Sequence, residues 1–260
     1  MSELKGQWAL VTGASSGLGV DFARELARRG ADIVLVARRI EPLQRLSEEL
    51  RALGVQVRVM PTDLGDVDAR EQLQRELDAA AIAIDILVNN AGFGLYGDFL
   101  RTDWARTEQM LQLDVVALTH LTRLFLPGMV QRRQGYVLQV ASIGAFQPSP
   151  TYAAYAAAKS YVLNFGVALN DELRGSGVSC TVVSPGVTAT EFLKVAGQKR
   201  NWFHNATMMT SADVAAIGVR AMLKRRASVV TGWLNTLMAL STRLTPLTWM
   251  AAISRWAMKA

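Results

Sequence analysis

Short apolar runs rich in β-branched residues alternate with longer segments of helical periodicity along most of this chain. Apolar runs lie at 7–11, 31–37, 55–60, 85–88, 136–141 and 228–231. Runs of this length are typical of strands that are buried on both faces. Alternation at this spacing predicts an α/β fold in which about seven strands form a doubly wound parallel sheet, with ligands at the carboxyl ends of the strands. No linker interrupts the pattern, so we expect one domain over 1–232, followed by a tail over 233–260.

A glycine-rich turn follows the first apolar run. It places Gly13, Gly17 and Gly19 between that run and a segment with helical periodicity. Glycine permits a tight turn and the close approach of an anion, and the N-terminus of a helix presents N–H groups to a phosphate. The turn therefore predicts that a dinucleotide binds here, in a single Rossmann-type domain. The alternative is that the glycines form a tight turn with a structural role only.

Two arginines, Arg38 and Arg39, follow the second apolar run. An NAD site usually has a carboxylate near this point for the ribose 2′-hydroxyl, whereas an arginine accommodates the 2′-phosphate of NADP. Ala37 leaves no carboxylate at the end of the run, and Glu41 comes later. We therefore predict NADP(H) as the cofactor, with a solvated arginine pair as the alternative.

A serine, a tyrosine and a lysine follow the run at 136–141. Ser142 stands at its carboxyl end, and an alanine-rich helical segment then carries Tyr155 and Lys159 on one face, four residues apart. A phenol has a pKa of about 10, and a neighbouring ammonium lowers that pKa. The trio predicts a site that protonates a carbonyl oxygen as a hydride reaches the attached carbon, although the spacing also occurs by chance.

Six short motifs, taken in order, resemble the classical short-chain dehydrogenase/reductase family over about residues 7–232. They are the turn at 12–19, Asp63-Leu64, Asn89-Asn90-Ala91-Gly92, Ser142, Tyr155 with Lys159, and Pro185-Gly186 with Thr188 and Thr190. The resemblance implies an NADPH-dependent carbonyl reductase that also acts as an alcohol dehydrogenase in reverse.

The resemblance also implies catalytic roles. Tyr155 would be the general acid/base, Ser142 would orient the carbonyl, and Lys159 would lower the pKa of the tyrosine and bind the nicotinamide ribose. The family usually has an asparagine in the long helix, where it holds a water of a proton relay, but this chain has Asp114. An ionised carboxylate cannot donate a hydrogen bond to that water, so we expect an active enzyme that depends less on the relay.

For the cofactor, the resemblance implies that Asp63 contacts the adenine, that Thr188 holds the carboxamide, and that Ser15 joins the arginine pair around the 2′-phosphate. The full predicted set is Gly13, Ser15, Ser16, Gly17, Leu18, Gly19, Arg38, Arg39, Asp63, Leu64, Asn89, Asn90, Ala91, Gly92, Tyr155, Lys159, Pro185, Gly186, Val187, Thr188 and Thr190.

Substrate contacts are expected from three segments, at 93–96, 144–152 and 191–210. The last segment has few periodic features and is typical of a mobile lid. Aromatic residues dominate the candidates, which favours an apolar ketone or aldehyde, although the same residues could pack the lid on the body. The candidates are Phe93, Tyr96, Gly144, Phe146, Tyr152, Phe192, Trp202 and Phe203.

The remaining composition excludes several kinds of site. A single cysteine, Cys180, allows no intrachain disulfide and lies in an apolar run, where we expect a core residue. The two histidines have no partners at metal-ligand spacing, so we predict no metal site. The first residues show no secretory signal, and we expect a cytoplasmic protein.

The net charge of +6 belongs to the end of the chain, because seven basic residues and no acidic residue follow Asp213. The tail over 233–260 is strongly apolar and predicts two amphipathic helices broken at Pro246, too short to span a membrane. We favour self-packing or contact with other copies in a homodimer or homotetramer, with peripheral membrane attachment as the alternative. No motif for nucleic-acid recognition accompanies the basic residues.

Two other functions are alternatives for this chain. A non-catalytic NADP(H) sensor or scaffold has Asp114 as its only support in the sequence. A sugar-nucleotide epimerase is disfavoured, because no extra substrate domain follows the seventh expected strand.

Overall fold

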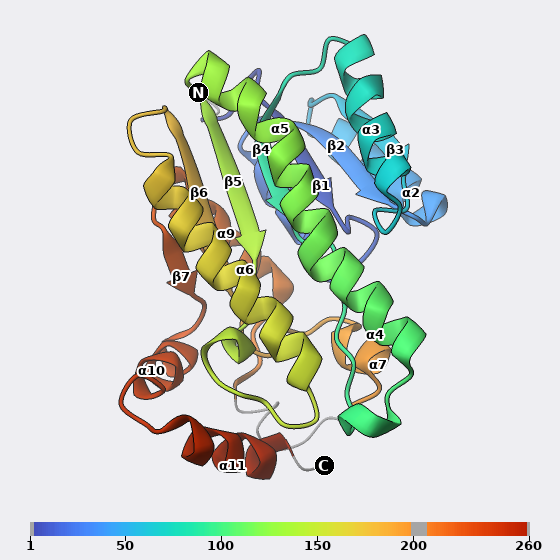
Figure 1. Ribbon diagram of the computed structural model, residues 1–260. Coiled ribbons are helices and arrows are strands. Elements are labelled where there is room, and N and C mark those ends of the chain that lie inside the picture. Colours follow the sequence, from blue (N-terminus) through green and yellow to red (C-terminus); the bar gives the residue numbers. More distant parts are fainter. Residues whose placement is uncertain (1–2, 199–206, 259–260) are drawn as a thin grey trace.

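The sheet has seven parallel strands in the order β3-β2-β1-β4-β5-β6-β7, in a computed structural model that describes residues 3–198 and 207–258 (Figure 1). The prediction of a doubly wound sheet is therefore confirmed. The chain reverses its direction of winding between β1 and β4, and at such a point the carboxyl ends of the strands diverge to leave room for a ligand. The strands are β1(Trp8–Thr12), β2(Asp32–Ala37), β3(Val57–Pro61), β4(Ile84–Asn89), β5(Gly135–Val140), β6(Val178–Ser184) and β7(Ser228–Val230).

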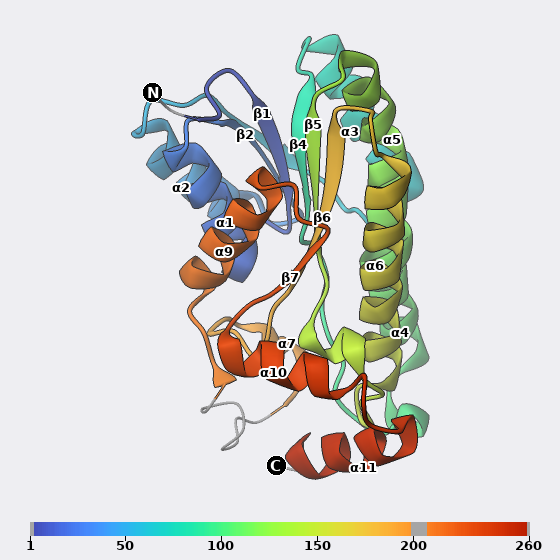
Figure 2. The ribbon, with the colours of Figure 1, turned by 90° about the vertical axis from the view of Figure 1, so that its left-hand side faces the viewer.

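Helices cover both faces of the sheet (Figure 2). One layer holds α1(Gly17–Arg28), α2(Ile40–Arg51) and α9(Ser211–Leu223). The other layer holds α3(Val67–Ala79), α4(Trp104–Leu111), α5(Leu118–Arg132) and α6(Ala153–Glu172). Burial on both faces explains why the strands are apolar at almost every position.

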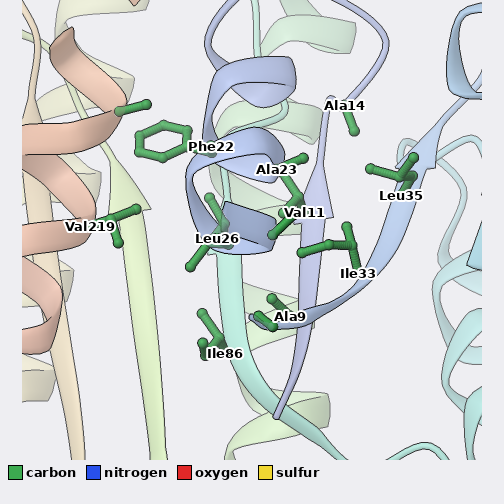
Figure 3. Packing of buried hydrophobic residues seen from close by; sticks show 14 of the residues in the cluster. Ala9, Val11, Ala14, Phe22, Ala23, Leu26, Ile33, Leu35, Ile86 and Val219 are labelled. Atoms are coloured by element: carbon green, nitrogen blue, oxygen red, sulfur yellow. The ribbon is translucent and has the colours of Figure 1, made fainter. Parts of the chain in front are cut away.

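The core forms because successive side chains of each strand point to opposite layers. Val11 of β1 packs with Phe22 and Leu26 of α1, and Phe22 also meets Val219 of α9 (Figure 3). Leu10, the neighbour of Val11, packs instead into the cluster beneath α3 and α5. Cys180 is buried in that second cluster, and burial raises the pKa of its thiol to about 12. The prediction that Cys180 is a core residue is confirmed.

The segment Trp104–Arg132 is one continuous helical rod. It consists of α4, a π-helical segment η2(Gln112–Ala117), and α5. By length and composition it is the one helix in the described residues that could cross a membrane, but Phe125 and Met129 pack against the sheet. Pro127 lies inside this rod, which continues to Arg132. Burial of Phe125 and Met129 on either side offsets the hydrogen bond that Pro127 cannot make.

Shorter elements surround the carboxyl ends of the strands. They are η1(Phe99–Arg101), η3(Ile143–Phe146), α7(Phe192–Ala196), α10(Trp233–Ser241) and α11(Leu247–Met258). The two helices of the tail are confirmed, and Pro246 lies between them as predicted. Of the expected lid, α7 forms the beginning, whereas Trp202 and Phe203 lie outside the described residues.

Candidate active site

Ser142, Tyr155 and Lys159 lie close together beyond the carboxyl end of β5. Ser142 is the N-cap of η3, and its Oγ accepts a hydrogen bond of 3.1 Å from Gly144 N. Tyr155 and Lys159 lie one turn apart on α6, and Lys159 Nζ is 5.7 Å from the centre of the Tyr155 ring. The strand end and the helical spacing therefore bring the three predicted side chains together.

Lys159 forms a buried ion pair with Asp114. Its Nζ lies 3.0 Å from Asp114 Oδ2 and donates to Val140 O at 3.1 Å. The two side chains are only 6% and 0% exposed, so water does not screen their interaction. The other carboxylate oxygen, Asp114 Oδ1, accepts a hydrogen bond of 3.0 Å from Phe93 N. Asp114 thus links the lysine to the loop after β4.

The π-helical segment places this carboxylate. Asp114 is the third residue of η2, and π-helical turns within α-helices are frequent at functional sites. Gly92 lies against it, and a Cβ atom at Gly92 would come within 2.7 Å of Asp114 Oδ1. The loop after β4 therefore needs glycine at this position in order to approach the carboxylate.

The electrostatics differ from the prediction for Tyr155. Burial raises the pKa of Tyr155 above its ordinary value, the negative charge of Asp114 raises this pKa further, and the Ser142 hydroxyl opposes both. The sequence predicted a lowered pKa for Tyr155, whereas this pKa is raised, first because the phenol is buried and second because the Asp114 carboxylate lies nearby. Burial also raises the pKa of Asp114, and the Lys159 ammonium and the Phe93 N–H oppose that rise.

The glycine turn between β1 and α1 packs tightly against the loop after β4. Gly13 and Gly17 have φ angles of +66° and +56°, which other residues rarely adopt. A Cβ atom at Gly13 would lie 2.9 Å from Ala91 Cα. Ser16 is the N-cap of α1 and makes no side-chain capping bond, so N–H groups of the first turn remain available to an anion.

A cleft of about 840 Å³ opens between this turn and the loop after β6. Ser16 and Gly17 line one side of the cleft, and Thr188 and Thr190 line the other. Pro185 O accepts a hydrogen bond of 2.8 Å from Ile143 N, which ties this loop to the segment that carries Ser142. The loop after β6 therefore connects the cleft to the segment of Ser142, although none of the three predicted catalytic residues lines the cleft itself.

Of the two predicted arginines, Arg39 reaches the glycine turn. Its Nη2 lies 3.2 Å from Ser15 Oγ and 3.4 Å from Ser15 O. Arg38 is exposed. The structure thus pairs Ser15 with Arg39 at the place where the sequence predicts a 2′-phosphate.

The side chains of two predicted cofactor residues make structural contacts. The Asn89 side chain is buried and turns toward α5, where its Nδ2 donates to Thr122 Oγ1 at 3.0 Å. The side chain of Leu64 packs in the core beneath α3. These side chains face the body of the protein, so the predicted cofactor contacts of Asn89 and Leu64 would come from their backbone atoms.

Asn90 holds the glycine turn and the loop after β4 together. Its Nδ2 donates to Thr12 O at 2.9 Å, and its N–H donates to Thr12 Oγ1 at 2.9 Å. Asp63 is exposed after β3 and accepts a hydrogen bond of 3.0 Å from Gly65 N. Sequence reasoning placed Thr12 in the turn but did not predict its contacts with the loop.

Four aromatic rings form a row beside the cleft. Tyr96 and Tyr152 are 5.4 Å apart between ring centroids, Tyr152 and Tyr155 are 5.7 Å apart, and Tyr155 and Phe192 are 5.4 Å apart. The Tyr152 hydroxyl donates to Gln198 Oε1 at 2.8 Å, and burial raises its pKa. Two of the predicted substrate residues, Tyr152 and Phe192, therefore contact the Tyr155 ring, and Tyr96 extends the row beyond Tyr152.

Three other predicted substrate residues lie elsewhere in this region. Phe146 is partly buried and packs against the core cluster of Leu118 and Val162, and its contact with a substrate stays a prediction. The Arg106 guanidinium lies over the Phe93 ring, with its Cζ atom 5.8 Å from the centre of the ring. At Gly144, a Cβ atom would lie 3.5 Å from Ser142 Oγ, which places this glycine beside the catalytic serine.

Known proteins are similar to this chain in sequence and in fold. A family model described as short chain dehydrogenase matches residues 7–201. The chain is 34% identical over 233 residues to an uncharacterized oxidoreductase of Myxococcus xanthus (strain DK1622), with 90% of each chain covered. It is also 34% identical over 199 residues to the 17-beta-hydroxysteroid dehydrogenase type 3 of Rattus norvegicus, which covers 75% of this chain and 64% of that relative.

A solved structure extends the similarity to a cofactor complex. The short-chain dehydrogenase from Sphingobium yanoikuyae in complex with NADPH is 30% identical to this chain, with a TM-score of 0.81. The match covers 92% of this chain and 94% of that one. The chain therefore belongs to the short-chain dehydrogenase family and is an NADP-dependent oxidoreductase that acts on CH–OH or C=O groups.

Proposed function

We propose that this enzyme reversibly reduces an apolar ketone or aldehyde to an alcohol, with Tyr155 as its general acid/base. The observation that carries the proposal is the placement of the Tyr155 phenol beside Ser142, within a row of aromatic rings and next to the cleft. A phenol and a hydroxyl that converge on one oxygen suit proton transfer to a carbonyl.

The residues around the cleft fit NADPH. The first turn of α1 suits the pyrophosphate, since its N–H groups lack a capping side chain and the glycines allow close approach. Arg39 and Ser15 suit the 2′-phosphate, because a guanidinium forms strong charge-assisted hydrogen bonds with phosphate. When bound, NADPH supplies the hydride.

The side chains of the enzyme manage the proton. Ser142 donates a hydrogen bond to the carbonyl oxygen and orients it, and Tyr155 delivers its phenolic proton to the same oxygen. Because burial and Asp114 raise the pKa of Tyr155, the phenol keeps its proton at neutral pH, as reduction requires. Oxidation needs the phenolate, so we expect alcohol oxidation to be favoured only at alkaline pH.

Lys159 acts through its position. An ammonium has three N–H donors. Among the described residues, Val140 O and Asp114 Oδ2 take two of these donors, and we assign the third to the ribose of the nicotinamide. Asp114 is a positioning residue in this proposal, because it holds the lysine directly. The enzyme then depends less on a water held in the long helix.

The proposed substrate class rests on the surroundings of Tyr155. Tyr96, Tyr152 and Phe192 offer ring faces rather than charges to a bound molecule. The name of the rat relative denotes a dehydrogenase of hydroxysteroids, which are apolar alcohols. Both observations support an apolar substrate over a sugar or a small acid.

The test is the oxidation of NADPH against a panel of apolar ketones and aldehydes. Tyr155→Phe should lower kcat about 10²- to 10⁴-fold, as expected for the loss of a general acid. Tyr161→Phe is the matched control, since Tyr161 lies on the same helix but bonds to Thr119. Equal rates for the wild type and Tyr155→Phe would refute the role of Tyr155. NADPH binding without turnover of any substrate would favour the sensor function.

A further inference from the structure

The two tail helices expose a continuous series of large apolar side chains. Trp233, Leu237 and Leu240 recur at helical spacing on α10, and the same spacing recurs on α11. This apolar face comprises Trp233, Leu237, Leu240, Leu244, Leu247, Trp249, Ile253 and Trp256, each of them more than half exposed. We define these eight residues as the tail face.

The exposure of the tail face is not a sign of an undocked tail. Asn235 and Ala239 of α10 are buried, as are Met250 and Ser254 of α11. A Cβ atom at Gly186 would strike the Asn235 side chain, so α10 is packed tightly on the loop after β6. Each helix therefore has one side packed against the body, while the outer side stays more than half exposed at every residue of the tail face, so packing on the body does not bury this face.

The uncovered area is large. The three tryptophans are 65–80% exposed. At 150–250 Å² for each aromatic side chain, they alone expose roughly 300–500 Å². That area already approaches the largest apolar patch of a typical monomer, about 300–600 Å², and the five aliphatic residues add to it. A surface of this size marks an interaction site.

The charge around the tail face selects the partner. Arg243 and Arg255 are exposed on this part of the chain, and no acidic residue follows Asp213. A symmetric contact between two copies of the tail would place these positive charges together without a carboxylate from either tail. An anionic lipid surface complements the arginines and also accepts the tryptophans, which favour the boundary between headgroups and acyl chains.

We propose that the tail face docks on anionic phospholipid membranes with α10 and α11 lying in the plane of the interface. The helices have 9 and 12 residues. At 1.5 Å per residue they are about 14 and 18 Å long, well short of the ~30 Å hydrocarbon core. They therefore bind at the surface and do not span the membrane.

Docking would also orient the active site. Figures 1 and 2 show α10 and α11 at the end of the molecule where the strands finish. Ser142 and Tyr155 lie at that same end, so the mouth of the active site would face the lipid. An advantage in capturing apolar substrates follows only from the proposed function, whereas the docking itself does not depend on it.

The experiment is co-sedimentation of the full-length protein with phosphatidylcholine vesicles, with and without phosphatidylserine. We expect strong binding only to the vesicles that contain phosphatidylserine. Replacing both Arg243 and Arg255 with alanine should weaken this binding about fivefold for each arginine removed. The double variant Trp233→Ser and Trp249→Ser should bind the vesicles that contain phosphatidylserine at least tenfold more weakly than the wild type. Leu53→Ser is the matched control, since Leu53 is 50% exposed in the loop before β3, at the opposite end of the strands from the tail.

Three results would overturn the proposal. They are the absence of vesicle binding by the wild type, equal binding to neutral and anionic vesicles, and unchanged binding of the double tryptophan variant. Sedimentation velocity without lipid adds a further check. If the wild type forms a dimer that the tryptophan variant loses, and the wild type does not bind vesicles, the tail face contacts a second copy of the chain. Turnover of a water-soluble ketone should be unchanged in every variant, which separates this test from the test of the reaction.

Discussion

Replacing Asp114 with asparagine removes one buried negative charge from the active site and nearly preserves the size of the side chain. In the wild type this carboxylate raises the pKa of Tyr155 and offsets the charge of Lys159. Lys159 and the Phe93 N–H contact different carboxylate oxygens, so the asparagine oxygen can accept from only one of them. The substitution therefore removes the charge near the phenol, keeps the size of the side chain and leaves one of its two contacts.

The expected magnitude follows from the distance between Lys159 and the phenol. The ammonium lies 5.7 Å from the centre of the Tyr155 ring. At an effective dielectric constant of about 20, a unit charge at that distance contributes about 3 kcal/mol, which corresponds to about 2 pKa units. Asp114 offsets part of this effect in the wild type, so we expect Asp114→Asn to lower the pKa of Tyr155 by about 1 to 2 units.

The assay is the pH dependence of kcat in both directions. Oxidation of the alcohol requires the phenolate, so its rate rises with pH until the phenol is deprotonated. A lower pKa in Asp114→Asn moves this rise to lower pH and increases oxidation at neutral pH by about 10- to 100-fold. The decline of the reduction rate at alkaline pH should move in the same direction. Asp98→Asn, at an exposed carboxylate, is the matched control and should leave both profiles unchanged.

Two results would refute this reasoning. If the profiles of Asp114→Asn superpose on those of the wild type, the charge at position 114 does not act on the phenol. If the profiles of Asp114→Asn move to higher pH, the carboxylate of Asp114 lowers the pKa of Tyr155 in the wild type and does not raise it. Circular dichroism should show that Asp114→Asn is folded, so that a change in the profile reports on the charge.

Three further predictions concern the same site and the cofactor cleft. Gly92→Ala places a Cβ atom within 2.7 Å of Asp114 Oδ1, so we expect it to lower kcat at least tenfold and to lower the melting temperature. Asp114→Ala leaves the Lys159 ammonium buried without its counter-ion, which should cost about 3–5 kcal/mol in urea unfolding. Arg39→Ala should raise the KM for NADPH about 10- to 100-fold without changing the KM for NADH, and Arg38→Ala should have a smaller effect.

Local spacing is what made the fold and the catalytic trio predictable. The alternation of apolar runs and helical segments fixes a parallel sheet, because strands joined by helices run in the same direction. Ser142 was predictable because it ends a strand, and Tyr155 with Lys159 because four residues make one turn of a helix. Each of these inferences needs only residues that are close in sequence.

Side-chain direction after a strand was less predictable. Asn89 and Asn90 are neighbours of the same type, yet Asn89 bonds to Thr122 on α5 and Asn90 bonds to Thr12 beneath the glycine turn. The resemblance to known enzymes assigned both to the cofactor. Only the register of β4 against the neighbouring elements decides which of the two amides faces the cleft.

The pKa of Tyr155 shows why a correct pairwise rule failed here. An ammonium does lower the pKa of a nearby phenol, but Lys159 is not the only charge in the site. Asp114 is 45 residues away in the sequence and reaches the lysine only because η2 and α6 lie side by side. In a buried site all nearby charges act on the phenol together. Because the carboxylate offsets the ammonium, burial has the largest effect on the pKa of Tyr155. Asp114 therefore favours the protonated tyrosine, which is the form that the proposed reduction of a carbonyl requires.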